Sequence, residues 1–490
     1  MGRDKTKIGT SQYSRRKIWI FRLGAVCLGM LPLLLLEGAL HLIGWSGPNG
    51  VADPYVGFTE IRPLFELDEA GKSFQIAESR KPLFCDDKFL AEKPPDEFRV
   101  FCVGGSTVQG RPFAIETSFA SWLELTLRAA DESKDWNVVN CGGVSYASYR
   151  LAPIMEEIVQ YQPDLIILYT GHNEFLEDRT YESVKTAPPW LVRTHERLSS
   201  SKTYSFVRSC LSGEQNPFSV TQLPSEVEAR LDFRNGLAAY SRDDDWKRDV
   251  VRHFEHNLRR MVKSVVQDDV CPIILCNPVC NLLDASPFKS EFSEELSEGQ
   301  IELVQAALTP SVEFAMAMSA EERVKKFESL LQLDDRHAEL HYQLGQSYFQ
   351  AGEYLKSKKH LVLAKEQDVC PLRIIEPMYE VIERVRAEFD LQFVDVKSFF
   401  ESKAEQGIPG RDQLIDHVHP TIHGHQLIAQ LLFEQMENQG LVNVGDDFDS
   451  KRKTSFESRL ESLSFMYFEL GKDRLDGLKR WAEGRVTREK

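Results

Sequence analysis

Short apolar runs that stop at polar, glycine-bearing turns recur along the chain. The first three runs are residues 99–103, 137–140 and 164–169. Each leads at once into a turn, and the turns are Gly104-Gly105-Ser106-Thr107, Cys141-Gly142-Gly143-Val144-Ser145-Tyr146 and Thr170-Gly171-His172-Asn173-Glu174. Apolar runs of this length, bounded by turn residues, are typical of buried strands in a parallel sheet. Residues 272–279 and 392–396 predict a fourth and a fifth strand.

Helical periodicity separates the predicted strands. Apolar residues recur at helical spacing over 119–127, in a stretch ending at Tyr161, and over 246–266, 375–389 and 424–436. Strand and helix therefore alternate, which implies right-handed crossovers and a parallel sheet whose polar turns fall on one edge. We expect an α/β fold, a flavodoxin-like three-layer sandwich with a central parallel sheet.

A helical segment interrupts this alternation between the fourth and fifth predicted strands. Within 338–368 the spacing of small and apolar residues is similar to that of a tetratricopeptide repeat, at positions His341, Leu344, Gly345, Tyr348, Ser357, Leu361 and Ala364. We count one and a half units, whereas a free-standing array needs about three. We therefore interpret 291–370 as a helical insertion that leans on the surrounding domain. A plain helical hairpin and a protein-docking module both remain open.

The chain opens with a basic stretch that is followed by an apolar one. Its first 17 residues carry six lysines and arginines against one acid, and residues 23–36 carry no charge. If Arg22 and Glu37 reach opposite interfaces, 18–45 provides roughly the 20 residues that cross a bilayer. We expect a single-pass anchor with its N-terminus in the cytoplasm and the remainder periplasmic or at the cell surface. A cleaved signal peptide is the alternative.

Composition narrows the choice of function. The formal net charge of −16 over 490 residues argues against a general nucleic-acid binder, which would carry a basic domain. Nine cysteines are too dilute for a disulfide scaffold, and none of their spacings is that of a zinc site. We therefore expect no nucleic-acid partner, no metal and no cofactor.

A carboxylate and a histidine stand just ahead of the last predicted helix. Asp416 precedes His419 by three residues, so one turn of chain can present both groups to a common partner. His419 is then a candidate general base whose orientation is set by Asp416. Ligands of open α/β sheets bind at the carboxyl ends of the strands, and Ser106 stands at such an end, as a nucleophile would.

Four blocks of residues, in this order, resemble those of the SGNH or GDSL-type hydrolases. They are Gly104-Gly105-Ser106-Thr107, Asn140-Cys141-Gly142-Gly143-Val144-Ser145, Gly171-His172-Asn173-Glu174 and Asp416-His417-Val418-His419-Pro420. The resemblance covers roughly 96–290 and 371–440. Two positions depart from the usual pattern, because Gly105 and Glu174 stand where the family commonly has Asp.

The resemblance implies a serine esterase with a Ser106, His419 and Asp416 triad. It further implies an oxyanion hole made by the Gly143 amide and the Asn173 side chain, with the Ser145 amide as the alternative to Gly143. The nearby alternatives to His419 as the base are His417, His423 and His425. The family's base stands directly before the proline, which favours His419.

The substrate expected from this resemblance and from the predicted location is a short-acyl ester, in particular an O-acetyl ester of carbohydrate or cell-envelope material. An O-acyltransferase that uses the same triad is one alternative. A catalytically inactive scaffold whose helical insertion docks a protein partner is the other.

These features divide the chain into seven expected segments. They are a basic cytoplasmic tail (1–17), a transmembrane anchor (18–45), a linker (46–95), the first part of the hydrolase domain (96–290), the helical insertion (291–370), the second part of the hydrolase domain (371–440) and a helical tail that packs back on the domain (441–490).

Overall fold

The computed structural model describes residues 28–29, 31–33, 35–40, 42, 58–61, 63–177, 203, 221–223, 236–267, 269–309 and 318–482. The chain divides into two compact units, Met1–Glu60 with Thr180–Leu223, and Ile61–Arg179 with Pro224–Lys490. Strands β1 (Phe58–Ile61) and β8 (Thr221–Leu223) pair as a two-stranded sheet. All the structure discussed below belongs to the second unit.

The predicted membrane anchor, 18–45, lies largely outside the described residues. Among the residues that are described, none of the helices combines the length and the apolar character that crossing a bilayer requires. The anchor therefore stays a prediction from the sequence.

The predicted parallel sheet is confirmed. Five strands lie in the order β10-β9-β7-β5-β6, and every neighbouring pair is parallel. Their bounds are β5 (Glu97–Gly104), β6 (Asp135–Gly142), β7 (Leu165–Tyr169), β9 (Ile273–Cys276) and β10 (Gln392–Val394). Counted along the chain, this is the strand order 2-1-3-4-5 of flavodoxin-like folds. Gly104 lies opposite both Gly142 and Tyr169, so the three polar turns begin at the same level of the sheet.

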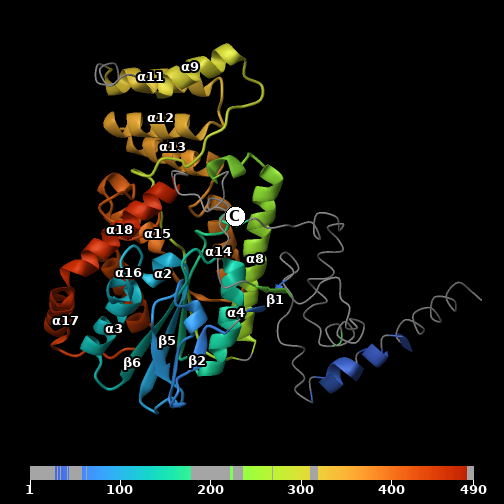
Figure 1. Ribbon diagram of the computed structural model, residues 1–490, viewed down its shortest axis with the longest axis vertical. Helices are drawn as coiled ribbons and strands as arrows, with labels where there is room; N and C mark the ends of the chain where they lie inside the picture. The colour runs from blue at the N-terminus through green and yellow to red at the C-terminus, as the bar shows by residue number, and fades with distance from the viewer. Residues whose placement is uncertain are drawn as a thin grey trace, which may run out of the picture. The chain divides into compact units, whose positions relative to one another are not determined.

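Helices cover both faces of this sheet, as Figure 1 shows. Helices α3 (Phe119–Ala130) and α16 (Ile422–Asn438) pack together on one face, and α8 (Asp244–Val266) packs against α4 (Ser148–Ile158) and α14 (Glu376–Glu388) on the other. Because the apolar residues of α3 recur at helical spacing, Trp122 and Leu123 are fully buried against the sheet. The shorter helices of this unit are α2 (Ser106–Gln109), α15 (Val396–Lys403) and the 3-10 turns Glu78–Arg80, Ile115–Thr117, Val159–Tyr161, Gly236–Ala239 and Glu405–Gly407.

Part of the predicted linker is folded. Strands β2 (Phe65–Leu67), β3 (Ser73–Ile76) and β4 (Lys88–Leu90) form an antiparallel sheet within 46–95, the stretch expected to be a linker that partly packs on the next domain. The Phe89 ring lies 4.9 Å from that of Phe65 and 5.4 Å from that of Phe101 in the central sheet. Strands of three or four residues are too short to show a period of two, which is why the sequence pattern missed them.

The helical insertion packs on the domain, as expected. It comprises α9 (Glu298–Leu308), α11 (Ala320–Leu331), α12 (Ala338–Gln350) and α13 (Tyr354–Gln367), and α12 packs against both α11 and α13. Its two ends meet, because the Val369 amide donates to the Lys289 carbonyl at 2.9 Å. Leu361 is buried with Cys280 and Val418 of the domain. Its identity as a tetratricopeptide repeat stays a prediction.

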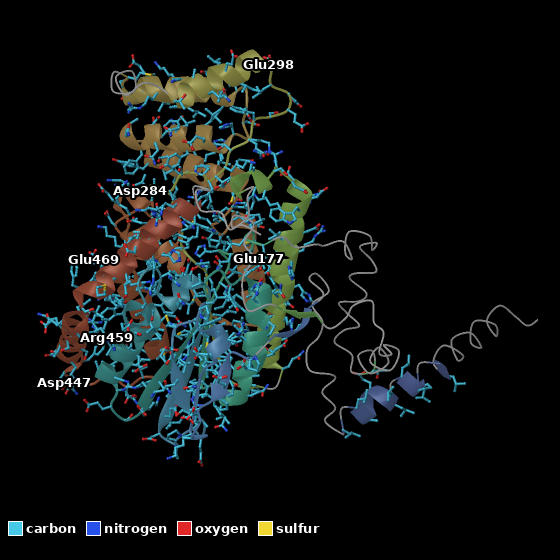
Figure 2. The ribbon with its side chains drawn as sticks, viewed as in Figure 1. Glu177, Asp284, Glu298, Asp447, Arg459 and Glu469 are labelled. Atoms are coloured by element: carbon cyan, nitrogen blue, oxygen red, sulfur yellow. The ribbon has the colours of Figure 1, made fainter. Side chains whose placement is uncertain are left out.

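The C-terminal tail forms two helices, α17 (Phe448–Ser462) and α18 (Phe465–Ala482). Both contact the domain. The Phe456 ring of α17 lies 4.6 Å from that of Trp122, and Arg459, labelled in Figure 2, donates to the Glu116 carbonyl at 3.1 Å. The tail therefore packs back on the domain, close to the segment that follows Ser106.

Candidate active site

Ser106 lies where the order of strands in the sheet reverses. Strand β5 ends at Gly104, Gly105 caps helix α2, and Ser106 is the first residue of that helix. Successive strands are added on opposite sides of β5, which makes the β5–β7 gap the switch point at which open α/β sheets bind ligands. The backbones approach closely here, because a Cβ on Gly104 would lie 2.0 Å from the Tyr169 carbonyl oxygen.

The structure brings together the three residues predicted to form the triad. Ser106 Oγ lies 2.7 Å from His419 Nε2, across 313 positions of the sequence. His419 Nδ1 lies 2.7 Å from Asp416 Oδ2. An ionised carboxylate only accepts hydrogen bonds, so Nδ1 carries the proton and Nε2 accepts from the Ser106 hydroxyl. Ser106 is 9% exposed and His419 is 4% exposed, so this line of hydrogen bonds is largely shielded from water.

Asp416 is held in place by the backbone around it. Its Oδ1 accepts hydrogen bonds from the amides of Val418 and His419, each at 2.8 Å. Burial disfavours the charged form, but attraction to His419 and the hydrogen bond from it outweigh burial and hold the pKa of the Asp416 carboxyl well below its usual range. Asp416 is therefore an anion at neutral pH and fixes the orientation of the imidazole.

Asn173 lies against the turn that carries the serine. Its Nδ2 donates to the Tyr146 carbonyl oxygen at 3.0 Å. A Cβ on Gly105 would lie 2.6 Å from the same Nδ2, so the amide group rests directly on the Gly105 backbone. A carboxamide has two N–H donors, and the contact with Tyr146 uses one of them. The other makes no hydrogen bond to the residues that the structure describes.

The structure corrects the preference for Gly143 as a backbone donor. The Gly143 amide donates to the Gly104 carbonyl at 3.0 Å and so is already engaged. A Cβ on Gly143 would lie 2.7 Å from the rings of Phe84 and Tyr146, so packing demands glycine there. The alternative, Ser145, has a φ of 63°, and its amide donates to none of the residues that the structure describes.

The other histidines near the fourth block do not bond to Ser106. His417 Nδ1 lies 3.7 Å from Asp416 Oδ1, and burial lowers the pKa of His417 to about 4. His425 Nδ1 accepts the Phe119 amide at 3.2 Å, and burial lowers the pKa of His425 to about 3. His423 is exposed on α16. His419 is thus the one histidine of the four that reaches the serine.

Glu174 has a role that the sequence did not reveal. It is fully buried, and its carboxylate accepts hydrogen bonds from the Ser148 amide at 2.7 Å and the Ser148 hydroxyl at 2.9 Å. Because Ser148 begins α4, Glu174 joins the third block to the first turn of that helix, where a negative charge is favourable. The one signal in the sequence was Ser148 at the start of an apolar periodic stretch, which indicates the beginning of a helix.

Tyr146 was also missed as part of the site. Its hydroxyl accepts a hydrogen bond from Arg80 Nη1 at 2.7 Å, and both side chains are 1% exposed. Arg80 lies 66 positions earlier, in the stretch interpreted as a linker, so no local pattern joins the two.

Metal ligands are not grouped in the described parts of the chain, where no three or more His, Cys, Asp or Glu side chains are placed to hold an ion. The seven described cysteines are free. The Sγ of Cys85 lies 4.0 Å from the Gln109 carbonyl oxygen, and burial raises the pKa of this thiol to about 11.

No protein-family model and no curated protein matches the chain. Solved structures do align with it. A Desulfitobacterium hafniense protein assigned to the G-D-S-L lipolytic family is 10% identical with a TM-score of 0.30, covering 69% of this chain and 99% of its own. A lipase/acylhydrolase of Enterococcus faecalis is 11% identical with a TM-score of 0.32, covering 71% and 99%. A protein of Parabacteroides merdae assigned as a GDSL-like lipase is 15% identical with a TM-score of 0.31, covering 72% and 99%.

The names of these solved structures include the GDSL-type family that the four sequence blocks resemble. The similarity is distant, at 10–15% identity for these three structures.

Proposed function

We propose that this chain is a serine esterase that hydrolyses short-acyl esters. The observation that supports this best is the unbroken line of two 2.7 Å hydrogen bonds from Ser106 through His419 to Asp416, at the switch point of a parallel sheet. A buried serine bonded to a histidine, with a carboxylate on its far nitrogen, is the arrangement that activates a hydroxyl as a nucleophile.

The first half of the reaction forms an acyl-enzyme. Ser106 Oγ attacks the ester carbonyl carbon while His419 Nε2 takes the hydroxyl proton, and the carbonyl electron pair moves onto the oxygen. Asp416 stabilises the imidazolium that results. When the intermediate collapses, the bond to the leaving alcohol breaks and His419 returns its proton to that oxygen.

Three donors are available to the oxyanion. They are the amide of Ser106, the amide of Ser145 and the second N–H of the Asn173 side chain. Donors placed in a water-poor site stabilise developing charge far more than they would in water. In the second half of the reaction, water loses a proton to His419 and attacks the acyl carbon. The bond between that carbon and Ser106 Oγ then breaks, His419 returns the proton to Oγ, and the acid is released.

The family resemblance and the expected location support one substrate class. We infer O-acetyl or other short-acyl esters of carbohydrate or envelope material, acted on outside the cytoplasm by a chain anchored through 18–45. The basic first 17 residues and the uncharged stretch after them support this location. A sugar hydroxyl in place of water would make the same acyl-enzyme a transferase. Acetate release measured against acetyl transfer to an added oligosaccharide separates the two reactions.

The test of the proposal is turnover of an activated acetate ester by the purified chain. Ser106→Ala should lower kcat by about 10⁴-fold or more, because the nucleophile is lost. Asn173→Ala should lower kcat by about 10²- to 10³-fold, because one oxyanion donor is lost. Both variants should keep the far-UV spectrum of the wild type. A fluorophosphonate should label the wild type and leave Ser106→Ala unlabelled, and wild-type turnover by Ser106→Ala would refute the proposal.

A further inference from the structure

Tyr146 links the Asn173 side chain to a buried arginine. At one end, its carbonyl oxygen accepts the hydrogen bond from Asn173 Nδ2 at 3.0 Å. At the other end, its hydroxyl accepts from Arg80 Nη1 at 2.7 Å. Tyr146 also closes the turn that carries Ser145, because its amide donates to the Gly143 carbonyl at 3.3 Å. One residue therefore contacts the elements that carry two of the three donors.

The surroundings of Tyr146 leave its ring little freedom. The Phe84 ring lies 4.9 Å away in an edge-on arrangement, the Arg80 guanidinium lies 5.8 Å from the ring centroid, and that of Arg150 lies 5.5 Å from it. Gly143 supplies the remaining wall, where a Cβ would lie 2.7 Å from Tyr146 Cγ. Because the ring is enclosed in this way, a shift of the Tyr146 hydroxyl would also shift the Tyr146 backbone.

Burying Arg80 at this place is energetically unfavourable. The side chain is 1% exposed, and its Nε and Nη2 atoms are buried with no hydrogen-bond partner among the described residues. A buried charge with unpaired donors destabilises a fold, and apolar side chains of similar volume usually replace such groups without loss of stability. Packing alone therefore does not explain an arginine at this position.

We propose that Tyr146, anchored by Arg80, is a positioning residue that sets the Asn173 amide and the Ser145 backbone for the oxyanion. The inference rests on the proposed esterase function and deepens it. The hydrogen bond to the Tyr146 carbonyl selects one orientation of the Asn173 carboxamide, with Nδ2 toward Tyr146 and its second N–H toward the ester. The hydrogen bond from Arg80 fixes the position of the turn that carries Ser145 and Tyr146, and so keeps the Tyr146 carbonyl in place for Asn173.

The experiment uses the full chain and compares kcat, KM and the unfolding midpoint. In the double variant Arg80→Met/Tyr146→Phe, the Arg80 donor and its phenol acceptor are removed together, so no Arg80 N–H is left without its acceptor. Arg150, which also bonds to the Tyr146 hydroxyl, keeps its hydrogen bonds to Glu177. Its kcat should fall about tenfold, less than the 10²- to 10³-fold cost of losing a whole donor. Its KM should stay within about twofold, because ground-state binding is unchanged. Tyr146→Phe alone should show the same fall in kcat and a lower midpoint, because Arg80 then has no partner.

Tyr161→Phe is the matched control. It removes a phenol hydroxyl that bonds to Glu157 at 3.0 Å, near the start of β7 and away from the turns that carry the triad. This variant should lose stability and keep the wild-type kcat.

The result that overturns the inference is a double variant with wild-type kcat, while Ser106→Ala in the same assay is inactive. A wild type without turnover at Ser106 overturns the proposed function, and this inference with it.

Discussion

At the scale of single residues, Gly105 stands where the resembled family commonly has Asp, and the atoms around it account for the glycine. Gly105 has φ of −86° and ψ of −156°, a conformation open to any residue, so its backbone does not require glycine. The space beside the Cα atom does require glycine. A Cβ there would lie 2.6 Å from Asn173 Nδ2 and 3.5 Å from the Tyr146 carbonyl oxygen. The departure at Gly105 is therefore a matter of room for the Asn173 amide.

Gly105→Ala should damage catalysis more than folding. The added methyl group displaces the end of the flexible Asn173 side chain, so kcat should fall toward the roughly 10²-fold loss of a missing oxyanion donor. The measurement is kcat on an activated ester together with the thermal midpoint. Gly299→Ala is the control, since a Cβ at Gly299 has nothing within 4 Å. Equal kcat in the two variants would contradict the placement of Asn173 in the oxyanion hole.

At the scale of elements, helix α18 holds the segment that follows the nucleophile. The Tyr467 hydroxyl lies 2.8 Å from Thr117 Oγ1 and accepts the Ala114 amide at 3.2 Å. Arg474 Nη1 donates to the Phe113 carbonyl at 2.7 Å, and the rings of Phe113 and Tyr467 are stacked 5.9 Å apart. The C-terminal helix is therefore part of the support for the serine turn.

Gly471→Ala should loosen this contact. A Cβ on Gly471 would lie 2.3 Å from the Phe113 ring, and overpacking of this kind costs about 1–3 kcal/mol. We expect a lower free energy of unfolding and faster amide hydrogen exchange over 111–118. Gly477→Ala, on the same helix with nothing within 4 Å of the added Cβ, should be neutral or stabilising. Similar stabilities for the two variants would show that α18 does not pack as described.

At the scale of the whole second unit, the insertion and the sheet domain share buried side chains. Leu361 of α13 is 1% exposed and lies in one cluster with Ile408 and Val418, next to the triad histidine in sequence. Lys365, also buried, donates to the Ile374 carbonyl at 2.9 Å and to Glu376 at 2.8 Å. The insertion is therefore a structural part of the domain that carries the site.

Leu361→Ala should destabilise the insertion and the sheet domain together. Truncation of a buried leucine costs about 2–5 kcal/mol, depending on how far the site collapses. Helix content and esterase activity should be lost at one common, lowered midpoint on heating. Loss of helix signal well below the temperature at which activity disappears would mean that the insertion unfolds on its own.

Buried histidines make the stability of this unit depend on pH. Burial lowers the pKa of His425 to about 3, against about 6.5 in the unfolded chain. As the pH falls below about 6.5, the unfolded chain therefore binds a proton that the folded chain refuses, and stability is lost. Asp368 acts in the opposite direction, because burial raises its pKa to about 6. A comparison of the wild type with one histidine variant at several pH values separates the contribution of His425 from that of Asp368.

His425→Gln should flatten the acid side of the stability profile. The wild type should lose stability relative to the variant by up to about 1.4 kcal/mol for each pH unit between 6.5 and 4, and the difference should be constant above pH 7. Urea unfolding at pH 7.5, 6.0 and 5.0 measures it. A difference that does not change with pH would contradict a neutral, buried His425.

The order of strands and helices along the chain was available from the sequence, and the resemblance of the four blocks pointed to Ser106, His419 and Asp416 as the candidate triad. Long apolar runs and helical periods are local, and Asp416 lies three residues from His419, so neighbouring positions carry this information. The five parallel strands and the hydrogen bonds among Ser106, His419 and Asp416 agree with that expectation.

Only the tertiary structure showed which of the two candidate backbone amides is already engaged in a hydrogen bond. Gly143 and Ser145 stand two residues apart in the same turn, and the choice depends on Gly104, a strand away, which takes the Gly143 amide. Likewise one hydrogen-bond partner of the Tyr146 hydroxyl is Arg80, in a stretch with no readable period. Local pattern reports which face of an element is buried, whereas the pairing of polar groups depends on residues that are distant in sequence and meet only when the chain has folded.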